Sequence, residues 1–127
     1  MALQVLVADD SRIFRALIRE VLEEKGFTVH EAANGKQALD LALALRPELL
    51  ILDALMPLIS GFEVIAKLRE MLPTYCPKLF IVTAVYKSYR WQSEAKTLYE
   101  VDEYLEKPVT PETLLATLQR HFPQLAT

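Results

Sequence analysis

The sequence predicts an α/β fold, in which a parallel sheet is covered by helices on both faces, and three observations carry this prediction. Residues 49–53 are four consecutive aliphatic side chains that lead into Asp53 without alternation, as in a strand buried on both sides. Pro57 prevents this strand from continuing as a paired strand. Five strand-like segments alternate with five helix-like segments along the chain, which is the pattern of repeated strand–helix–strand units.

The first strand is expected at 5–8 and ends in the acidic pair Asp9 and Asp10. Ser11 stands where its side chain can cap a helix over 12–25. The apolar residues of that helix recur at helical spacing and predict one buried face, made of Phe14, Leu17, Ile18, Val21 and Leu22.

Glycine and proline mark the limits of the next elements. Gly26 stands where a left-handed helix cap is expected, and the alternating residues 27–31 indicate a strand near the edge of the sheet. Asn34 and Gly35 open a second helix, which Pro47 stops shortly before the 49–53 strand.

The second half of the chain repeats the pattern. Ser60 and Glu63 form a capping box for a third helix that runs to about residue 72. Residues 79–82 predict a fully buried strand that ends at Thr83. A fourth helix is expected over 89–99.

The last strand and helix are short. Residues 102–105 are largely polar and predict an edge strand, which Lys107 and Pro108 follow. Thr110 caps a fifth helix and Pro111 opens it, because proline is tolerated in the first helical turn. The buried stripe of this helix is expected to be Leu114, Leu115 and Leu118.

These elements predict a flavodoxin-like three-layer sandwich, a five-stranded parallel sheet in order 2-1-3-4-5 with five helices. The order places the two polar strands at the edges and the apolar strands inside. Ligands bind such sheets at the carboxyl ends of the strands, where the strand order reverses. That point lies between the first and third strands, so Asp9, Asp10 and Asp53 are expected to meet there.

Composition restricts the class of protein. With 127 residues the chain is expected to be one domain over 1–127 with no output domain, and a charge of -3 gives no general attraction to nucleic acid. The only cysteine, Cys76, forms no internal disulfide, and no apolar run is long enough to span a membrane. The N-terminus resembles a strand rather than a signal peptide, so a cytoplasmic location is expected.

Three carboxylates that converge on one crevice repel each other and favour a bound divalent cation. Oxygen ligands in an octahedral shell suit Mg²⁺ or Mn²⁺. Thr83 adds a hydroxyl and Lys107 an ammonium at the ends of the fourth and fifth strands. Together these groups describe a site for a phosphoryl group on a carboxylate, since aspartate is an established nucleophile for phosphoryl transfer.

The whole chain resembles a response-regulator receiver domain of two-component signalling, of the single-domain kind similar to chemotaxis regulators. The matching residues are Asp9, Asp10, Asp53, Met56, Pro57, Gly61, Thr83, Ala84, Tyr104, Leu105, Glu106, Lys107 and Pro108. Each match is weak by itself, but five groups in this order at the right strand ends are specific.

The resemblance implies a role for each site residue. Asp53 matches the residue that accepts phosphate from a sensor histidine kinase or a phosphotransfer protein. Mg²⁺ (or Mn²⁺) is implied on Asp9, Asp10, Asp53 and the backbone carbonyl of Leu55. Thr83 and Lys107 match the residues that contact the phosphoryl group. Thr83 and Tyr104 match a pair of switch residues, and the Lys107–Pro108 peptide is expected to be cis.

The expected output is a change of the face formed by the fourth helix, the 102–105 strand and the fifth helix, which then controls an unknown downstream protein. The chain is expected to be a monomer or a phosphorylation-dependent dimer. It is not expected to be an enzyme beyond its own phosphorylation and dephosphorylation. Two alternatives are a pseudo-receiver scaffold that ignores phosphodonors and, less favoured, an aspartyl-phosphate phosphohydrolase, whose usual Asp-x-Asp-x-Thr pattern is absent.

Some residues depart from the family pattern. Ser60 stands where the family often has aspartate, and Glu100 stands where a glycine commonly precedes the last strand, so a strained turn is expected there. A turn of a different kind is the alternative to strain at Glu100. The interval from Thr83 to Lys107 is about two residues longer than is common. The surplus falls in a basic and aromatic segment that could bind a partner or could begin the fourth helix, with Tyr86, Tyr89, Arg90 and Trp91.

Overall fold

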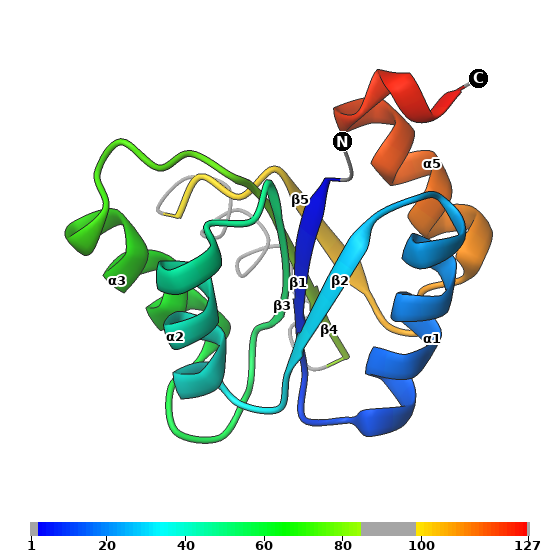
Figure 1. Cartoon of the computed structure of the whole chain (residues 1–127). Helices are drawn as coiled ribbons and strands as arrows, with labels where there is room; N and C mark the ends of the chain where they lie inside the picture. Colours follow the sequence, from blue (N-terminus) through cyan, green and yellow to red (C-terminus); the bar gives the residue numbers. More distant parts are fainter. Residues whose placement is uncertain (1–2, 85–98, 127) are drawn as a thin grey trace.

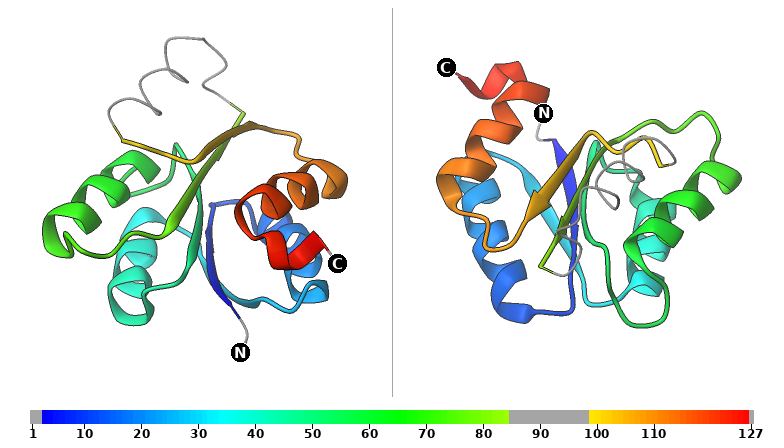
Figure 2. Two further views of the ribbon diagram at one scale, coloured as in Figure 1. Left: turned by 90° about the horizontal axis from the view of Figure 1, so that it is seen from above. Right: turned by 180° about the vertical axis from the view of Figure 1, so that it is seen from behind.

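The computed structural model describes residues 3–84 and 99–126. They form a sheet of five parallel strands in the order β2-β1-β3-β4-β5. Figure 1 shows α1 and α5 on one face of this sheet and α2 and α3 on the other, and the view from above in Figure 2 shows the same three layers. The predicted flavodoxin-like sandwich and its strand order are therefore confirmed.

The strands are placed by their side chains. The central strands are β1 (Gln4–Ala8), β3 (Leu49–Asp53) and β4 (Lys78–Thr83), and every residue of β3 is buried. The edge strands are β2 (Thr28–Ala32), in which only Val29 and Ala32 are buried, and β5 (Glu103–Glu106), in which no residue is fully buried. Polar residues are tolerated at the edges because one side of an edge strand remains close to solvent.

Two separate apolar cores fill the spaces above and below the sheet. Successive residues of β1 pack into opposite cores. Val5 and Val7 face α1 and α5, whereas Leu6 and Ala8 face α2 and α3. Because both faces are covered, the central strands carry polar residues only at their ends, at Gln4, Asp53, Lys78 and Thr83. This explains the apolar run that ends at Asp53.

Each described α-helix begins at a side chain that accepts a hydrogen bond from a backbone N–H. The helices are α1 (Arg12–Glu24), α2 (Gly35–Leu45), α3 (Gly61–Met71) and α5 (Pro111–His121), followed by the short helix η1 (Pro123–Ala126). Their caps are the predicted ones: Ser11, Asn34, Ser60 and Thr110. Ser60 and Glu63 form the complete capping box, so the replacement of the family's usual aspartate keeps the cap.

Several predicted boundaries are wrong by a residue. The N–H of Phe27 bonds to the carbonyl of Leu22 in the helix cap, so β2 begins one residue later. Asp102 turns its carboxylate onto the N–H of Leu79, and β5 begins after it.

The predicted buried face of α1 is too wide. Leu17 is 42% exposed, whereas Ile18 and Leu22 are buried against the sheet and α5. Helical spacing makes Leu17 a neighbour of this stripe, but only the central part of the apolar arc reaches the core. Leu45, at the end of α2, is likewise 41% exposed.

Of the two alternatives that the sequence left open for the turn before β5, a different turn or a strained one, the structure has the strained one. Glu100 has a φ of 52°, in the left-handed region that favours glycine. The predicted fourth helix, apart from Tyr99, and the cluster of Tyr86, Tyr89, Arg90 and Trp91 lie outside the described residues. Among the described helices, none has the length and apolar character needed to cross a membrane.

Candidate phosphoryl-acceptor site

The three acids meet because β1 and β3 are neighbours at the point where the strand order reverses. Asp9 and Asp10 directly follow β1, and Asp53 is the last residue of β3. One oxygen from each carboxylate lies within 4.8 Å of those of the other two. The sequence prediction that these carboxylates converge therefore agrees with the geometry.

Asp9 is fully buried, and both of its carboxylate oxygens have partners. The backbone N–H of Ser11 donates to Oδ1 at 2.8 Å, and the Lys107 ammonium donates to Oδ2 at 2.6 Å. A buried charge of this kind is tolerated only with such compensation. Asp9 is thus fixed in place before any ligand binds.

Asp53 lies beside it and is 8% exposed. The N–H of Leu55 donates to Oδ1 at 3.1 Å, and Lys107 donates to Oδ2 at 3.1 Å. Burial raises the pKa of Asp53, and the charge of Asp9 raises it further, although Leu55 and Lys107 act in the opposite direction. The carboxylate therefore lies in an environment where added positive charge is strongly favoured.

Lys107 bridges the two buried carboxylates from the loop after β5. Its Nζ also lies 4.4 Å from the centre of the Phe14 ring, within the range of a cation–π contact. Burial by itself lowers the pKa of Lys107, but the hydrogen bond to Asp9 and the charges of both carboxylates raise it above its usual value. The Lys107 side chain as a whole is 20% exposed.

The loop after Asp53 is fitted closely against two helix starts. A Cβ on Gly61 would lie 2.3 Å from the carbonyl oxygen of Asp53, and one on Gly35 would lie 1.9 Å from that of Ile59. Both distances are too short for any side chain. The N–H groups of these glycines bond to the carbonyls of Ala54 and Pro57, which fixes the loop that carries Leu55.

The other predicted residues are placed as follows. Asp10 is exposed at the mouth of the site, and Thr83 is fully buried at the end of β4. Tyr104 is partly buried on β5 and packs against the core beneath α2 and α3. The Lys107–Pro108 peptide bond is cis. Leu55 is held beside Asp53 by its N–H, and a role for its carbonyl stays a prediction.

The donor set fits a divalent cation. It offers oxygen atoms only, from three acids of which one is exposed, and hard cations such as Mg²⁺ and Mn²⁺ prefer such ligands. The position of the Lys107 ammonium between two of the acids shows that this crevice already requires positive charge.

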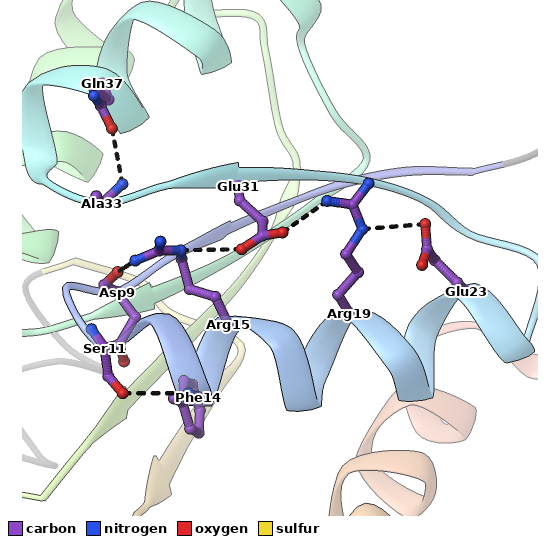
Figure 3. A network of polar contacts seen from close by, with 9 residues as sticks. All are labelled: Asp9, Ser11, Phe14, Arg15, Arg19, Glu23, Glu31, Ala33 and Gln37. Carbon is purple, nitrogen blue, oxygen red and sulfur yellow. Dashed lines mark hydrogen bonds and ion pairs between the residues drawn. The ribbon is translucent and has the colours of Figure 1, made fainter.

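The sequence analysis missed a network beneath the site. Figure 3 shows Arg15 of α1 between the backbone of Asp9 and the carboxylate of Glu31 on β2. Arg15 and Glu31 are far apart in the sequence, so spacing could not pair them. An arginine on the sheet side of α1 and an acid at the end of an edge strand were the available signals.

The fold and the site define an open α/β protein with an acidic, lysine-bridged crevice at the carboxyl ends of its strands. A family model described as the response regulator receiver domain matches residues 5–119. The chain belongs to this family.

Similar protein sequences agree with this family assignment. The chain is 34% identical over 122 residues to the response regulator MprA of Mycolicibacterium vanbaalenii, a match covering 94% of this chain and 50% of that protein. The chain thus spans about half the length of this relative. It is also 34% identical to an uncharacterised 14.6 kDa protein of Leptolyngbya boryana, over 94% of this chain and 89% of that one.

Solved structures agree as well. The chemotaxis response regulator CheY4 of Vibrio cholerae superimposes with a TM-score of 0.85 at 33% identity, covering 94% of this chain and 98% of that one. The receiver domain of AraT, a response regulator from Geobacillus stearothermophilus, gives a TM-score of 0.79 at 33% identity and covers both chains completely.

Proposed function

We propose that this receiver domain is a phosphorylation-dependent switch in which Asp53 accepts a phosphoryl group from a histidine kinase or a phosphotransfer protein. The observation that carries the proposal is the Lys107 bridge. One ammonium lies 2.6 Å from Asp9 and 3.1 Å from Asp53, at the end of the strands where a phosphoryl group could reach Asp53. A purely structural acid would not need this second buried carboxylate beside it.

The proposed chemistry is the transfer of a phosphoryl group from a histidine nitrogen, which is the leaving group, to a carboxylate oxygen, which is the nucleophile. A carboxylate oxygen of Asp53 forms a bond to phosphorus while the bond from phosphorus to the histidine nitrogen breaks, and the imidazole leaves with that electron pair. Asp9, Asp10, Asp53 and the carbonyl of Leu55 would hold Mg²⁺ or Mn²⁺, which supplies positive charge for the phosphoryl oxygens. Lys107 and the hydroxyl of Thr83 would contact those same oxygens.

Thr83 and Tyr104 would then couple the charge of the phosphoryl group on Asp53 to a change in the protein surface. Thr83 is the last residue of β4. Tyr104 lies on the neighbouring strand β5, where it pairs with Ile81 of β4. Attraction of the threonine hydroxyl to a phosphoryl oxygen would alter the space beside Tyr104. The surface of β5 and α5, together with the fourth helix that the sequence predicts over 89–99, would present that change to a downstream protein, by a population shift of roughly 1–3 kcal/mol.

The acceptor is tested by incubating the full chain with Mg²⁺ and a small phosphodonor, followed by intact-mass measurement. A gain of one phosphoryl group is expected, and none in Asp53→Asn. Full labelling of Asp53→Asn would refute the acceptor. A chain that is never labelled would favour the pseudo-receiver, and continuous turnover of a generic phosphatase substrate would favour the phosphohydrolase.

The switch is tested with beryllofluoride and Mg²⁺, which mimic the phosphorylated state. The NMR signals of the Tyr104 ring and the fluorescence of Trp91, the only tryptophan, are expected to change. Unchanged signals from both residues would leave the site without an output.

A further inference from the structure

The carboxylate of Asp10 is held differently from its two neighbours. Asp9 and Asp53 are each fixed by a backbone N–H and by Lys107. Asp10 is exposed, and no hydrogen bond from the described part of the chain reaches its carboxylate. The direction of this side chain therefore depends on the backbone that carries it.

That backbone is held by Arg15. The Nη1 of Arg15 donates to the carbonyl oxygen of Asp9 at 2.7 Å. This carbonyl belongs to the peptide bond that joins Asp9 to Asp10, and a peptide bond is planar. Fixing its oxygen therefore fixes the direction in which the chain enters Asp10.

Arg15 is in turn fixed by Glu31. The Nε of Arg15 donates to Oε1 of Glu31 at 3.0 Å, and the two side chains are only 15% and 26% exposed. Glu31 pairs with Val7 in the sheet, so it is anchored to the strand that leads to Asp9. The Nη1 of Arg19 donates a hydrogen bond to the other oxygen of Glu31, Oε2, at 2.7 Å. Figure 3 shows this chain of contacts along α1.

We propose that Arg15, oriented by Glu31, is a positioning residue that holds the Asp9–Asp10 peptide so that the Asp10 carboxylate is directed toward a divalent cation. The inference rests on the proposed function, because it takes Asp10 as a ligand of that cation. The guanidinium suits this role because its planar fork can bind a carbonyl and a carboxylate at once. Glu31 stays ionised in this setting, since the hydrogen bond from Arg19 lowers its pKa despite partial burial.

The sign of one measurement separates positioning from simple electrostatics. Arg15 is a cation near a cation site, so its removal would tighten metal binding if charge alone mattered. If Arg15 positions Asp10, its removal weakens metal binding. The two explanations predict opposite changes in affinity for the same variant.

The experiment is calorimetric titration of the full chain with MgCl₂, with circular dichroism as a check of folding. Arg15→Gln is expected to weaken Mg²⁺ binding about tenfold, the low end of the range for groups that orient metal ligands. Arg15→Lys is expected to lie between this variant and the wild type, because an ammonium can reach the carbonyl but cannot also fork onto Glu31. It carries the test if Arg15→Gln does not fold.

Two further variants test whether Glu31 acts on Mg²⁺ binding through Arg15. Glu31→Gln is expected to weaken binding alone but to add nothing in an Arg15→Gln background, because Glu31 acts through Arg15. The matched control is Arg120→Gln, which removes a helix arginine paired at 2.9 Å with Glu103 on the other edge strand. Its Mg²⁺ affinity should equal that of the wild type.

The outcomes are distinct. Equal or tighter Mg²⁺ binding in Arg15→Gln, with binding intact in the wild type, overturns the positioning role and leaves the proposed function standing. A wild type that binds no Mg²⁺ overturns both. A backbone NMR signal of Asp10 that is unaltered by Arg15→Gln would also contradict the positioning role.

Discussion

Removing Lys107 should expose how much the acidic crevice depends on it. In Lys107→Met the aliphatic volume is largely kept, but Asp9 and Asp53 lose their shared cation. Their side chains are only 1% and 10% exposed, so water cannot replace it fully. Breaking a buried ion pair from one side costs roughly 3–5 kcal/mol, and the 20% exposure of Lys107 places the expected loss at about 3 kcal/mol.

The assay is urea denaturation at neutral pH, in EDTA and in millimolar Mg²⁺. The free energy of unfolding of Lys107→Met should fall by that amount in EDTA. Mg²⁺ should restore much of it, because a divalent cation supplies the charge that the ammonium no longer provides. Mg²⁺ should also stabilise the variant more than the wild type, in which Lys107 repels it.

Lys36→Met is the matched control. Lys36 pairs with Asp40 at 3.5 Å on the surface of α2, where the side chains are 69% and 64% exposed. Its loss should change stability by no more than about 0.5 kcal/mol and should not alter the effect of Mg²⁺. The reasoning is refuted if Lys107→Met is as stable as the wild type in EDTA, or if Mg²⁺ stabilises both proteins equally.

Three more predictions follow from single positions. Gly61→Ala should lose about 1–3 kcal/mol of stability by thermal or urea unfolding, because its Cβ would lie 2.3 Å from the carbonyl oxygen of Asp53; unchanged stability would show that the α3 start can shift freely. Glu100→Gly should gain roughly 0.5–1 kcal/mol, since it relieves a φ of 52°, and a loss would contradict the strain. The lowered pKa of Glu31, held by its hydrogen bond from Arg19, adds stability above its ordinary value of 4.5 that is lost as pH falls through its folded pKa. Glu31→Gln should therefore be less stable than the wild type at pH 7 by about 0.5–1 kcal/mol. A stability deficit that persists at pH values well below the folded pKa of Glu31 would count against the ion pair.

Local signals in the sequence determined most of the fold. The apolar run before Asp53 required a strand covered on both faces, and the helix caps at Ser11 and Ser60 act within one helical turn. Strand–helix alternation then restricted the topology, which placed Asp9 and Asp53 at the ends of neighbouring strands. Each of these determinants acts over a few residues or through a general rule of chain connection.

The sequence was less able to set exact limits and exposures. Leu17 belongs to the apolar arc of α1 by spacing, but its 42% exposure depends on how closely α1 approaches α5 and the sheet. The start of β2 depends on whether the N–H of Phe27 serves the helix cap or the sheet, and the cap takes it. The exposure of a side chain and the first residue of a strand depend on contacts between two elements, so the sequence of either element alone does not determine them.

The contacts that fix the site were decided by tertiary structure. Lys107 reaches Asp9 across 98 residues of chain, and the sequence predicted its presence at the site but not that it bridges two buried carboxylates. Arg15 reaches both the Asp9 carbonyl and Glu31 only because α1 lies over β1 and β2. Periodicity specifies which face of an element is buried, whereas a hydrogen bond depends on distances of a few tenths of an ångström between elements, which only packing of the whole domain sets.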